Sequence, residues 1–153
     1  MSPIQSEQDI QIIANLLKSI ELFKDLDEKI HAEIIRHVTM DYLPENHLIF
    51  NEGDVADRMY FIKTGKVKIF HAGVSQSFDE ELAILGPSDF FGEMALISEE
   101  PRNASAKTIE TTEVFIFREK DFLNMIATNP SVAEVISKEF LERMKKNISN
   151  KKG

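Results

Sequence analysis

The residues best suited to chemistry lie in the stretch 89–105, and the chemistry that they fit is the binding of an anion. Residues 93–97 are predicted to form one short helical turn, because Gly92 ends a preceding strand and Pro101 stops the turn before a new strand that begins at Arg102. The first backbone N–H groups of such a turn have no intrahelical acceptor and favour a negative charge. Gly92 lets that backbone approach the anion closely, and Arg102 can hold it through a forked, charge-assisted pair.

These groups predict a site for one compact phosphate, with Glu93 left as an acceptor for a hydroxyl. Ser105 or the backbone N–H of Ala104 would add a further donor. The alternative is that Glu93 and Arg102 pair with each other while the apolar residues around them fill the core. As an isolated pair of charges, Glu93 and Arg102 are compatible both with a phosphate site and with a simple ion pair.

The four histidines form a poor catalytic or metal-binding set. They are His31, His37, His47 and His71. The first two are six residues apart on a predicted helix and therefore face different sides. A β-roll metal enzyme would need two histidines that alternate on one strand beside a carboxylate. The chain also has no cysteine, nucleophile elbow or phosphate loop, so we expect no metal, no cofactor and no enzymatic activity, with a metal enzyme as the least favoured alternative.

Length and composition predict one domain of 153 residues, enough for a single hydrophobic core. The 42% of hydrophobic and 29% of charged residues are ordinary for a globular protein. No apolar run approaches the roughly 20 residues that a membrane helix needs, and the first residues do not resemble a secretory signal. Together with the absence of cysteine, these features predict a cytoplasmic domain with no membrane segment.

The net charge of −8 is unevenly distributed along the chain. Residues 138–153 hold six Lys or Arg and two Glu, so this tail carries about +4 and the remainder about −12. An acidic body repels nucleic acid, whose binding depends on many basic contacts to phosphate. We therefore expect no DNA binding. The basic tail is interpreted as a solvated helix end, with contact to an acidic partner as the alternative.

Apolar spacing divides the single domain, residues 1–153, into three parts. Residues 8–38 are predicted to form helices, with apolar side chains at three- and four-residue spacing. Residues 39–118 change to short β-type runs separated by turn residues, as in a sandwich or barrel. Helical spacing returns in residues 119–148, where Pro130 suits the first turn of the last helix. The expected strands include Leu48 to Phe50, Met59 to Ile62, Val67 to Phe70, Leu82 to Leu85 and Glu113 to Phe117.

Two strings of residues carry a specific pattern. The first reads Phe91-Gly92-Glu93-Met94-Ala95-Leu96-Ile97, three residues, then Pro101-Arg102-x-Ala104-Ser105, and the second reads Phe50-x-x-Gly53-Asp54-x-x-Asp57-x-x-Tyr60-Phe61-Ile62-x-x-Gly65-x-Val67. They resemble the phosphate-binding cassette and the glycine turns of the cyclic nucleotide-binding domain family. The resemblance implies an α+β fold, in which an eight-stranded antiparallel, jelly-roll-like β-roll is flanked by N-terminal helices, a short cassette helix and C-terminal lid helices.

The resemblance also implies a set of ligand-binding residues. The set is Phe91, Gly92, Glu93, Met94, Ala95, Arg102, Asn103, Ala104, Ser105, Ile69 and Arg143. Arg102 would pair with the exocyclic phosphate oxygens, and Glu93 would accept from the ribose 2′-OH. The backbone N–H groups of residues 92–95 and of Ala104 would donate to the ligand, with Ser105 as a supporting hydroxyl. Ile69 and Met94 are expected as apolar walls for the base.

The base and the last helix are less closely specified. Arg143 lies where bacterial channel-type members of the family place an arginine against the purine, and the alternative is an arginine that faces solvent. Position 103, often Ala in cyclic AMP binders and Thr in cyclic GMP binders, is Asn103 here. We expect cyclic AMP as the ligand, with cyclic GMP as the alternative. Ser88, where many members have Gly, should be tolerated if its φ is negative.

The function implied by the resemblance is that of a sensor, which converts nucleotide binding into movement of the last helix and so into contact with an unidentified protein effector. The main alternative is a protein-interaction module of the same fold that needs no ligand. The presence of both Arg102 and Glu93 argues against that alternative.

Overall fold

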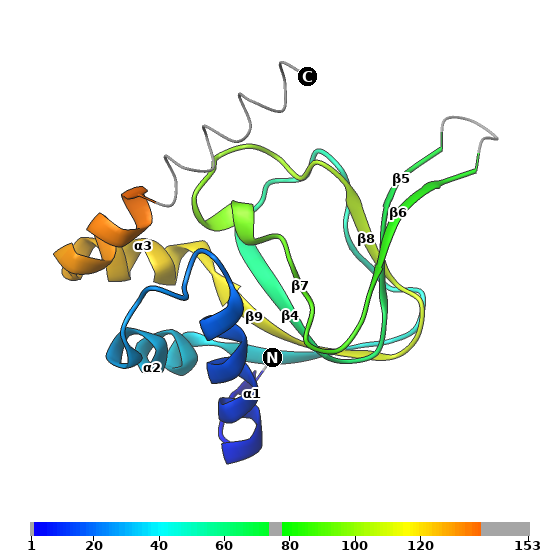
Figure 1. The fold of residues 1–153 in the computed structure, drawn as a ribbon. Helices are drawn as coiled ribbons and strands as arrows, with labels where there is room; N and C mark the ends of the chain where they lie inside the picture. The colour runs from blue at the N-terminus through cyan, green and yellow to red at the C-terminus, as the bar shows by residue number, and fades with distance from the viewer. Residues whose placement is uncertain (1, 74–77, 139–153) are drawn as a thin grey trace.

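Helices gather on one side of two antiparallel sheets in the computed structural model, which describes residues 2–73 and 78–138 (Figure 1). The helices of these residues are α1 (Glu7–Ser19), α2 (Glu28–His37), the 3-10 helix η1 (Glu93–Leu96) and α3 (Glu119–Thr128), and residues 130–138 are also helical. The strands are β1 (Ser2–Pro3), β2 (Thr39–Leu43), β3 (Leu48–Phe50), β4 (Arg58–Thr64), β5 (Val67–His71), β6 (Glu80–Leu85), β7 (Phe90–Phe91), β8 (Ser105–Thr108) and β9 (Thr112–Arg118). Strands β2 to β9 confirm the predicted α+β fold with an eight-stranded antiparallel roll.

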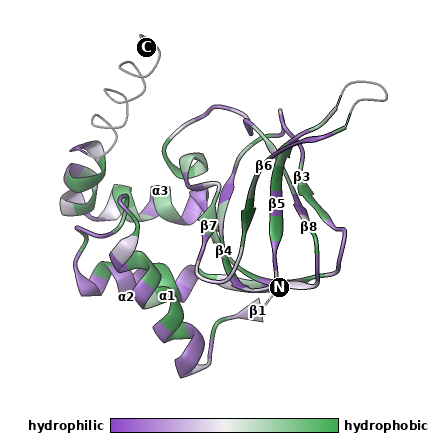
Figure 2. Ribbon diagram, turned by 45° about the vertical axis from the view of Figure 1, so that its right-hand side comes forward, coloured by the Kyte–Doolittle hydropathy of each residue, from purple (hydrophilic) through white to green (hydrophobic). Residues whose placement is uncertain are grey.

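The first two helices begin at side-chain caps that the sequence supplies. The Ser6 hydroxyl accepts a hydrogen bond from the Asp9 N–H at 3.0 Å, and the Asp27 carboxylate accepts one from the Ile30 N–H at 3.0 Å. Each bond satisfies a backbone donor that the helix itself cannot satisfy. Figure 2 shows apolar and polar residues side by side on both helices, as expected of amphipathic helices that cover a core.

The roll consists of a five-stranded sheet in the order β1-β2-β9-β4-β7 and a four-stranded sheet in the order β3-β8-β5-β6. Strand β4 pairs with both β9 and β7, so that Tyr60 lies opposite Ile116 on one side and Phe91 on the other. Strand β8 lies between β3 and β5, with Ala106 opposite both Phe50 and Ile69. Strand β8, which follows η1 in the chain, therefore lies beside β3, although the two strands are far apart in the sequence.

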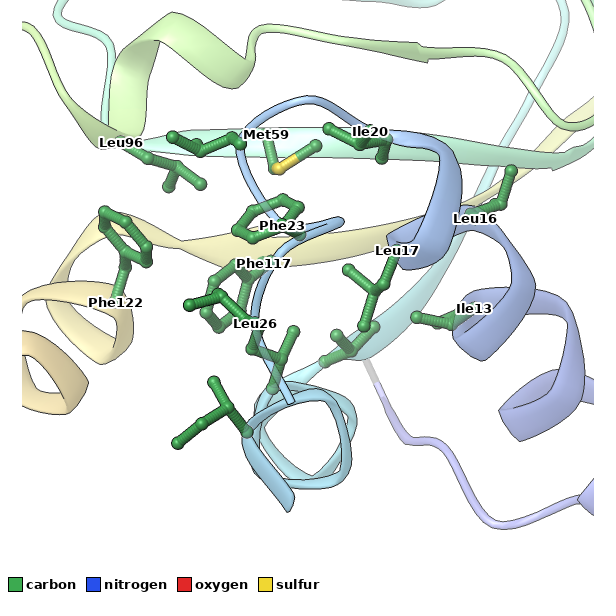
Figure 3. Packing of buried hydrophobic residues seen from close by; sticks show 14 of the residues in the cluster. Ile13, Leu16, Leu17, Ile20, Phe23, Leu26, Met59, Leu96, Phe117 and Phe122 are labelled. Atoms are coloured by element: carbon green, nitrogen blue, oxygen red, sulfur yellow. The ribbon is translucent and has the colours of Figure 1, made fainter. Parts of the chain in front are cut away.

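Two hydrophobic clusters lie on opposite faces of the five-stranded sheet. One fills the space between that sheet and the helices, where Phe23, Phe117 and Phe122 are completely buried (Figure 3). Val132 and Ile136 join this cluster, so the helical residues 130–138 also pack on the core. The other cluster lies between the two sheets and includes the side chains of β4 that alternate with those of the first. Within the described ranges, no helix has both the length and the apolar character needed to cross a bilayer.

Three features differ from the expectations. The strand after the cassette begins at Ser105 and not at Arg102, because the Arg102 N–H donates to the Asp54 carbonyl and its own carbonyl accepts from the Gly53 N–H. Ser88 has a φ of 72°, so the negative φ on which its tolerance was made conditional is not adopted; the turn between β6 and β7 uses the left-handed region. The sequence did not predict β1, a two-residue strand that pairs with β2.

Candidate ligand-binding site

The cassette helix η1 is positioned by the pairing of β7 with β4. Strand β7 ends at Phe91, and Gly92 then takes a left-handed conformation with a φ of 77° as the N-cap of η1. A Cβ atom on Gly92 would lie 2.6 Å from Nη1 of Arg102. Glycine is therefore required twice at this position, for its φ and for the close approach of the guanidinium. The predicted short helical turn after Gly92 is present.

Arg102 is the charge at the centre of the site. Its side chain is buried, and Nη2 donates to the Arg58 carbonyl at 2.8 Å. Its guanidinium carbon lies 4.2 Å from the centroid of the Phe50 ring and 6.0 Å from that of Tyr60. Burial is the main influence on the pKa of Arg102 and lowers it from the usual value. The buried Nε finds no hydrogen-bond acceptor in the described part of the chain, as expected of a cation that binds an external anion.

A cavity of about 660 Å³ opens beside this guanidinium, within the size range of small-molecule sites. Its walls contain nine of the eleven predicted residues: Phe91, Gly92, Glu93, Met94, Ala95, Arg102, Asn103, Ala104 and Ile69. Charged, apolar and backbone groups from β5, η1 and the segment before β8 thus meet at one place. Arg143, a further predicted residue, lies outside the described residues.

Ser105 is placed behind the cavity wall rather than on it. Its side chain is buried, and its hydroxyl oxygen accepts a hydrogen bond from the Glu52 N–H at 2.9 Å. That bond joins the start of β8 to the turn after β3. The hydroxyl therefore holds the turn beside the cassette, and its predicted contact with the ligand stays a prediction.

The described residues do not show the simple ion pair between the two charges of the cassette. Among the ion pairs of residues 2–73 and 78–138, none joins Glu93 to Arg102. Arg102 instead contacts the Arg58 carbonyl and the Phe50 ring, while Glu93 lies on the cavity wall.

Six further residues line the cavity and were not predicted as site residues. They are Glu21, Phe50, Ala56, Ser98, Glu100 and Pro101. Phe50 could have been suspected, since it begins the second motif string and precedes the turn that bonds to Arg102. Glu21 carries no such signal, because it comes from the connection between α1 and α2 and reaches the cavity only through the tertiary fold.

The histidines are dispersed, and three of them have separate partners. His31 Nε2 lies 2.7 Å from the Phe23 carbonyl oxygen, and His71 Nδ1 lies 2.8 Å from a Glu52 carboxylate oxygen. His37 faces Asp121 at 3.7 Å. The described residues contain no cluster of three or more His, Cys, Asp or Glu side chains that could hold a metal ion.

Comparison with known proteins identifies the family to which the fold belongs. Residues 40–129 match the family model described as the cyclic nucleotide-binding domain. The chain belongs to this family. The predicted resemblance is confirmed, and the matched residues include η1, Arg102 and every strand from β3 to β9.

Relatives of this cyclic nucleotide-binding domain come from different kinds of protein. The chain is 33% identical over 128 residues to a cyclic nucleotide-gated potassium channel of Mesorhizobium japonicum, covering 84% of this chain and 34% of the channel. It is 34% identical over 102 residues to a cyclic AMP receptor protein of Thermus thermophilus, covering 67% and 47%. Thus the chain spans half or less of the length of both relatives.

A solved structure shares the fold. The N-terminal domain of a transcriptional regulator from Streptomyces coelicolor superposes with a TM-score of 0.77 at 27% sequence identity, covering 88% of this chain and 94% of that structure. The same domain fold is therefore found in proteins whose remaining parts differ.

Proposed function

We propose that this domain binds a 3′,5′-cyclic purine nucleotide, cyclic AMP, in the cavity beside η1. The observation that carries the proposal is the buried guanidinium of Arg102, whose Nε lacks an acceptor within the described residues and whose Nη1 lies against Gly92. A phosphate at this place would neutralise the guanidinium and accept from the first N–H groups of η1. The charge and the backbone donors then act on the same anion.

The other walls suit the rest of the nucleotide. Glu93, the first residue of η1, would accept from the ribose 2′-OH. Ile69 and the half-exposed Met94 would pack against the faces of the base, since aliphatic and thioether groups are suitable apolar neighbours for a purine.

Adenine is the proposed base, and Asn103 is the residue that could favour guanine instead. Its side-chain oxygen could accept from the guanine amino group, which adenine lacks at that position. The relative from Thermus thermophilus is named as a receptor for cyclic AMP, which supports adenine.

Calorimetric titration of the purified domain with cyclic AMP, cyclic GMP and linear 5′-AMP tests the proposal. Cyclic AMP is expected to bind most tightly, and 5′-AMP more weakly, because a phosphate with an additional charge and no ring does not fit a compact site. Preference for cyclic GMP would change the proposed base to guanine, with Asn103 as the residue that recognises it. Absence of binding by both cyclic nucleotides would favour the ligand-independent interaction module.

We further infer that ligand binding is coupled to the C-terminal helix. Residues 130–138 are helical and pack through Val132 and Ile136 on the same cluster that contains Leu96 of η1. A change in the position of η1 could therefore reach this helix through the side chains of the shared cluster. Couplings of this kind commonly amount to about 1 to 3 kcal/mol.

Hydrogen exchange of the amides of residues 132–146, measured with and without cyclic AMP, tests the coupling. Slower exchange is expected in the bound form, and Arg143→Ala is expected to reduce the difference while the cassette stays protected. Equal exchange in both states, together with protection of residues 92–105, would mean that nucleotide binds without this coupling.

We propose that the moved helix contacts a protein effector. A cytoplasmic location is also proposed, because a chain without cysteine does not depend on disulfides. The domain is proposed to act through binding and not through catalysis.

A further inference from the structure

The guanidinium of Arg102 lies against an aromatic ring that comes from a distant part of the sequence. Phe50 is the last residue of β3, and its ring centroid is 4.2 Å from the guanidinium carbon. The ring is itself held in place, because its centroid lies 6.0 Å from both the Tyr60 and Phe91 rings. Those two rings stack on each other at 4.9 Å with an interplanar angle of 11°. The guanidinium thus rests on a packed aromatic group.

We propose that Phe50 is a positioning residue that fixes the plane of the Arg102 guanidinium for the phosphate. This inference rests on the proposed function, since it assigns a cause to the phosphate affinity of the same site. Arginine has a flexible side chain, and holding it in one rotamer costs conformational entropy. A cation–π contact with an aromatic ring offsets part of that cost and tolerates the burial of the cation.

The remaining contacts of Arg102 do not fix its plane by themselves. Nη2 makes one hydrogen bond to the Arg58 carbonyl, and a single bond leaves rotation about its axis possible. Nη1 is limited on one side by Gly92, which has no side chain with which to hold it. The Phe50 ring lies 4.2 Å from the guanidinium carbon itself and restricts how the group can turn, and its orientation decides which phosphate oxygens the N–H groups can reach.

Phe50 also lines the cavity, so direct contact between its ring and the nucleotide is the competing explanation. The two explanations predict that substitution of Phe50 changes different properties of ligand binding. A ring that acts through Arg102 affects discrimination between the two exocyclic phosphate oxygens. A ring that packs on the base affects all phosphate forms equally.

The test compares Phe50→Leu, which keeps apolar volume but removes the aromatic face, with Phe50→Tyr, which keeps the face. Phe50→Leu is expected to weaken cyclic AMP binding about threefold to tenfold, and Phe50→Tyr to stay within about twofold of the wild type. Thermal unfolding without ligand checks that each variant is folded. Phe50→Met replaces Phe50→Leu if the latter does not fold.

The decisive measurement uses the two phosphorothioate diastereomers of cyclic AMP, in which sulfur replaces one or the other exocyclic oxygen. The wild type and Phe50→Tyr are expected to distinguish the diastereomers, and Phe50→Leu is expected to reduce their affinity ratio towards one. An unchanged ratio in Phe50→Leu, or no discrimination by the wild type, overturns the positioning role. If the wild type binds no cyclic nucleotide at all, the proposed function itself fails, which is a different result from normal binding by Phe50→Leu.

Discussion

Two aromatic trios lie on opposite faces of the five-stranded sheet and differ in burial, in ring geometry and in neighbours. Phe23, Phe117 and Phe122 are completely buried and meet edge to face at centroid distances of 6.2 to 6.3 Å (Figure 3). The second trio, formed by Phe50, Tyr60 and Phe91, contains a stacked pair and lies beside a cation. The first has only apolar neighbours to satisfy, whereas the second also supports a charge at the edge of a cavity.

Strand β4 explains how one sheet supports both trios. Met59 and Phe61 point towards the helices and belong to the first cluster, while Tyr60 and Ile62 point between the sheets and belong to the second. The alternation of a β-strand therefore separates a packing face from a binding face by a single residue. Substitutions on the two faces are therefore expected to have different consequences. Those on the packing face should favour unfolding, and those on the binding face should weaken ligand binding.

Phe117→Ala should produce the largest effect and act on stability. Removing a completely buried ring from the first trio is expected to lower the free energy of unfolding by about 3 to 5 kcal/mol, measured by urea denaturation. Cyclic AMP affinity of the folded protein is expected to stay within about threefold of the wild type, since Phe117 faces away from the cavity. Phe117→Leu is the milder variant, with an expected loss below about 1.5 kcal/mol. A large loss of affinity in a folded variant would contradict the separation of the packing face from the binding face.

Arg102→Ala should have the opposite profile. Cyclic nucleotide binding is expected to weaken by about 2 to 5 kcal/mol, because a buried phosphate loses its charged partner. Stability without ligand should change little, since the variant also removes a buried cation with an unsatisfied Nε. Calorimetry and thermal unfolding measure the two quantities. An affinity within a factor of three of the wild type would show that the phosphate lies elsewhere.

The sequence predicted the parts of the site that are contiguous in the chain and not those that depend on topology. Gly92 and η1 were predictable because a glycine, a short apolar turn and a stopping proline follow one another. The contacts of Arg102 with Phe50 and with the Arg58 carbonyl were not, since the first depends on β8 lying beside β3 and the second on the position of β4 in the other sheet. The sign of φ at Ser88 was likewise hidden, because it depends on how two sheets are joined and not on the residue itself.

The fold was predictable where periodicity is strong. Strands β4, β5 and β9 were expected within a few residues of their observed ends, because their apolar residues lie in short runs bounded by turn residues. Strand β1 was not, since two residues are too few to show a period.

Glu93→Gln separates ribose recognition from phosphate recognition within the cavity. If the carboxylate accepts from the 2′-OH, the variant should weaken cyclic AMP binding by about 1 to 2 kcal/mol and 2′-deoxy cyclic AMP much less. Competition binding of both ligands to both proteins provides the four affinities. Equal losses for the two ligands would remove the ribose assignment and leave Arg102 unaffected.

Ser88→Gly tests the turn that joins the two sheets and belongs to neither trio. Ser88 has a φ of 72°, and its N–H donates to the Ile62 carbonyl at 3.0 Å, so the turn is anchored in its left-handed conformation. The left-handed region costs a residue with a Cβ about 1 to 2 kcal/mol, and the greater flexibility of unfolded glycine returns roughly half of that. The free energy of unfolding is therefore expected to rise by about 0.5 to 1 kcal/mol, with cyclic AMP affinity unchanged. Ser88→Ala is the matched control, since it removes the hydroxyl but keeps the Cβ, and it should not stabilise the protein. Equal stabilisation by both variants would assign the effect to the hydroxyl and not to the backbone.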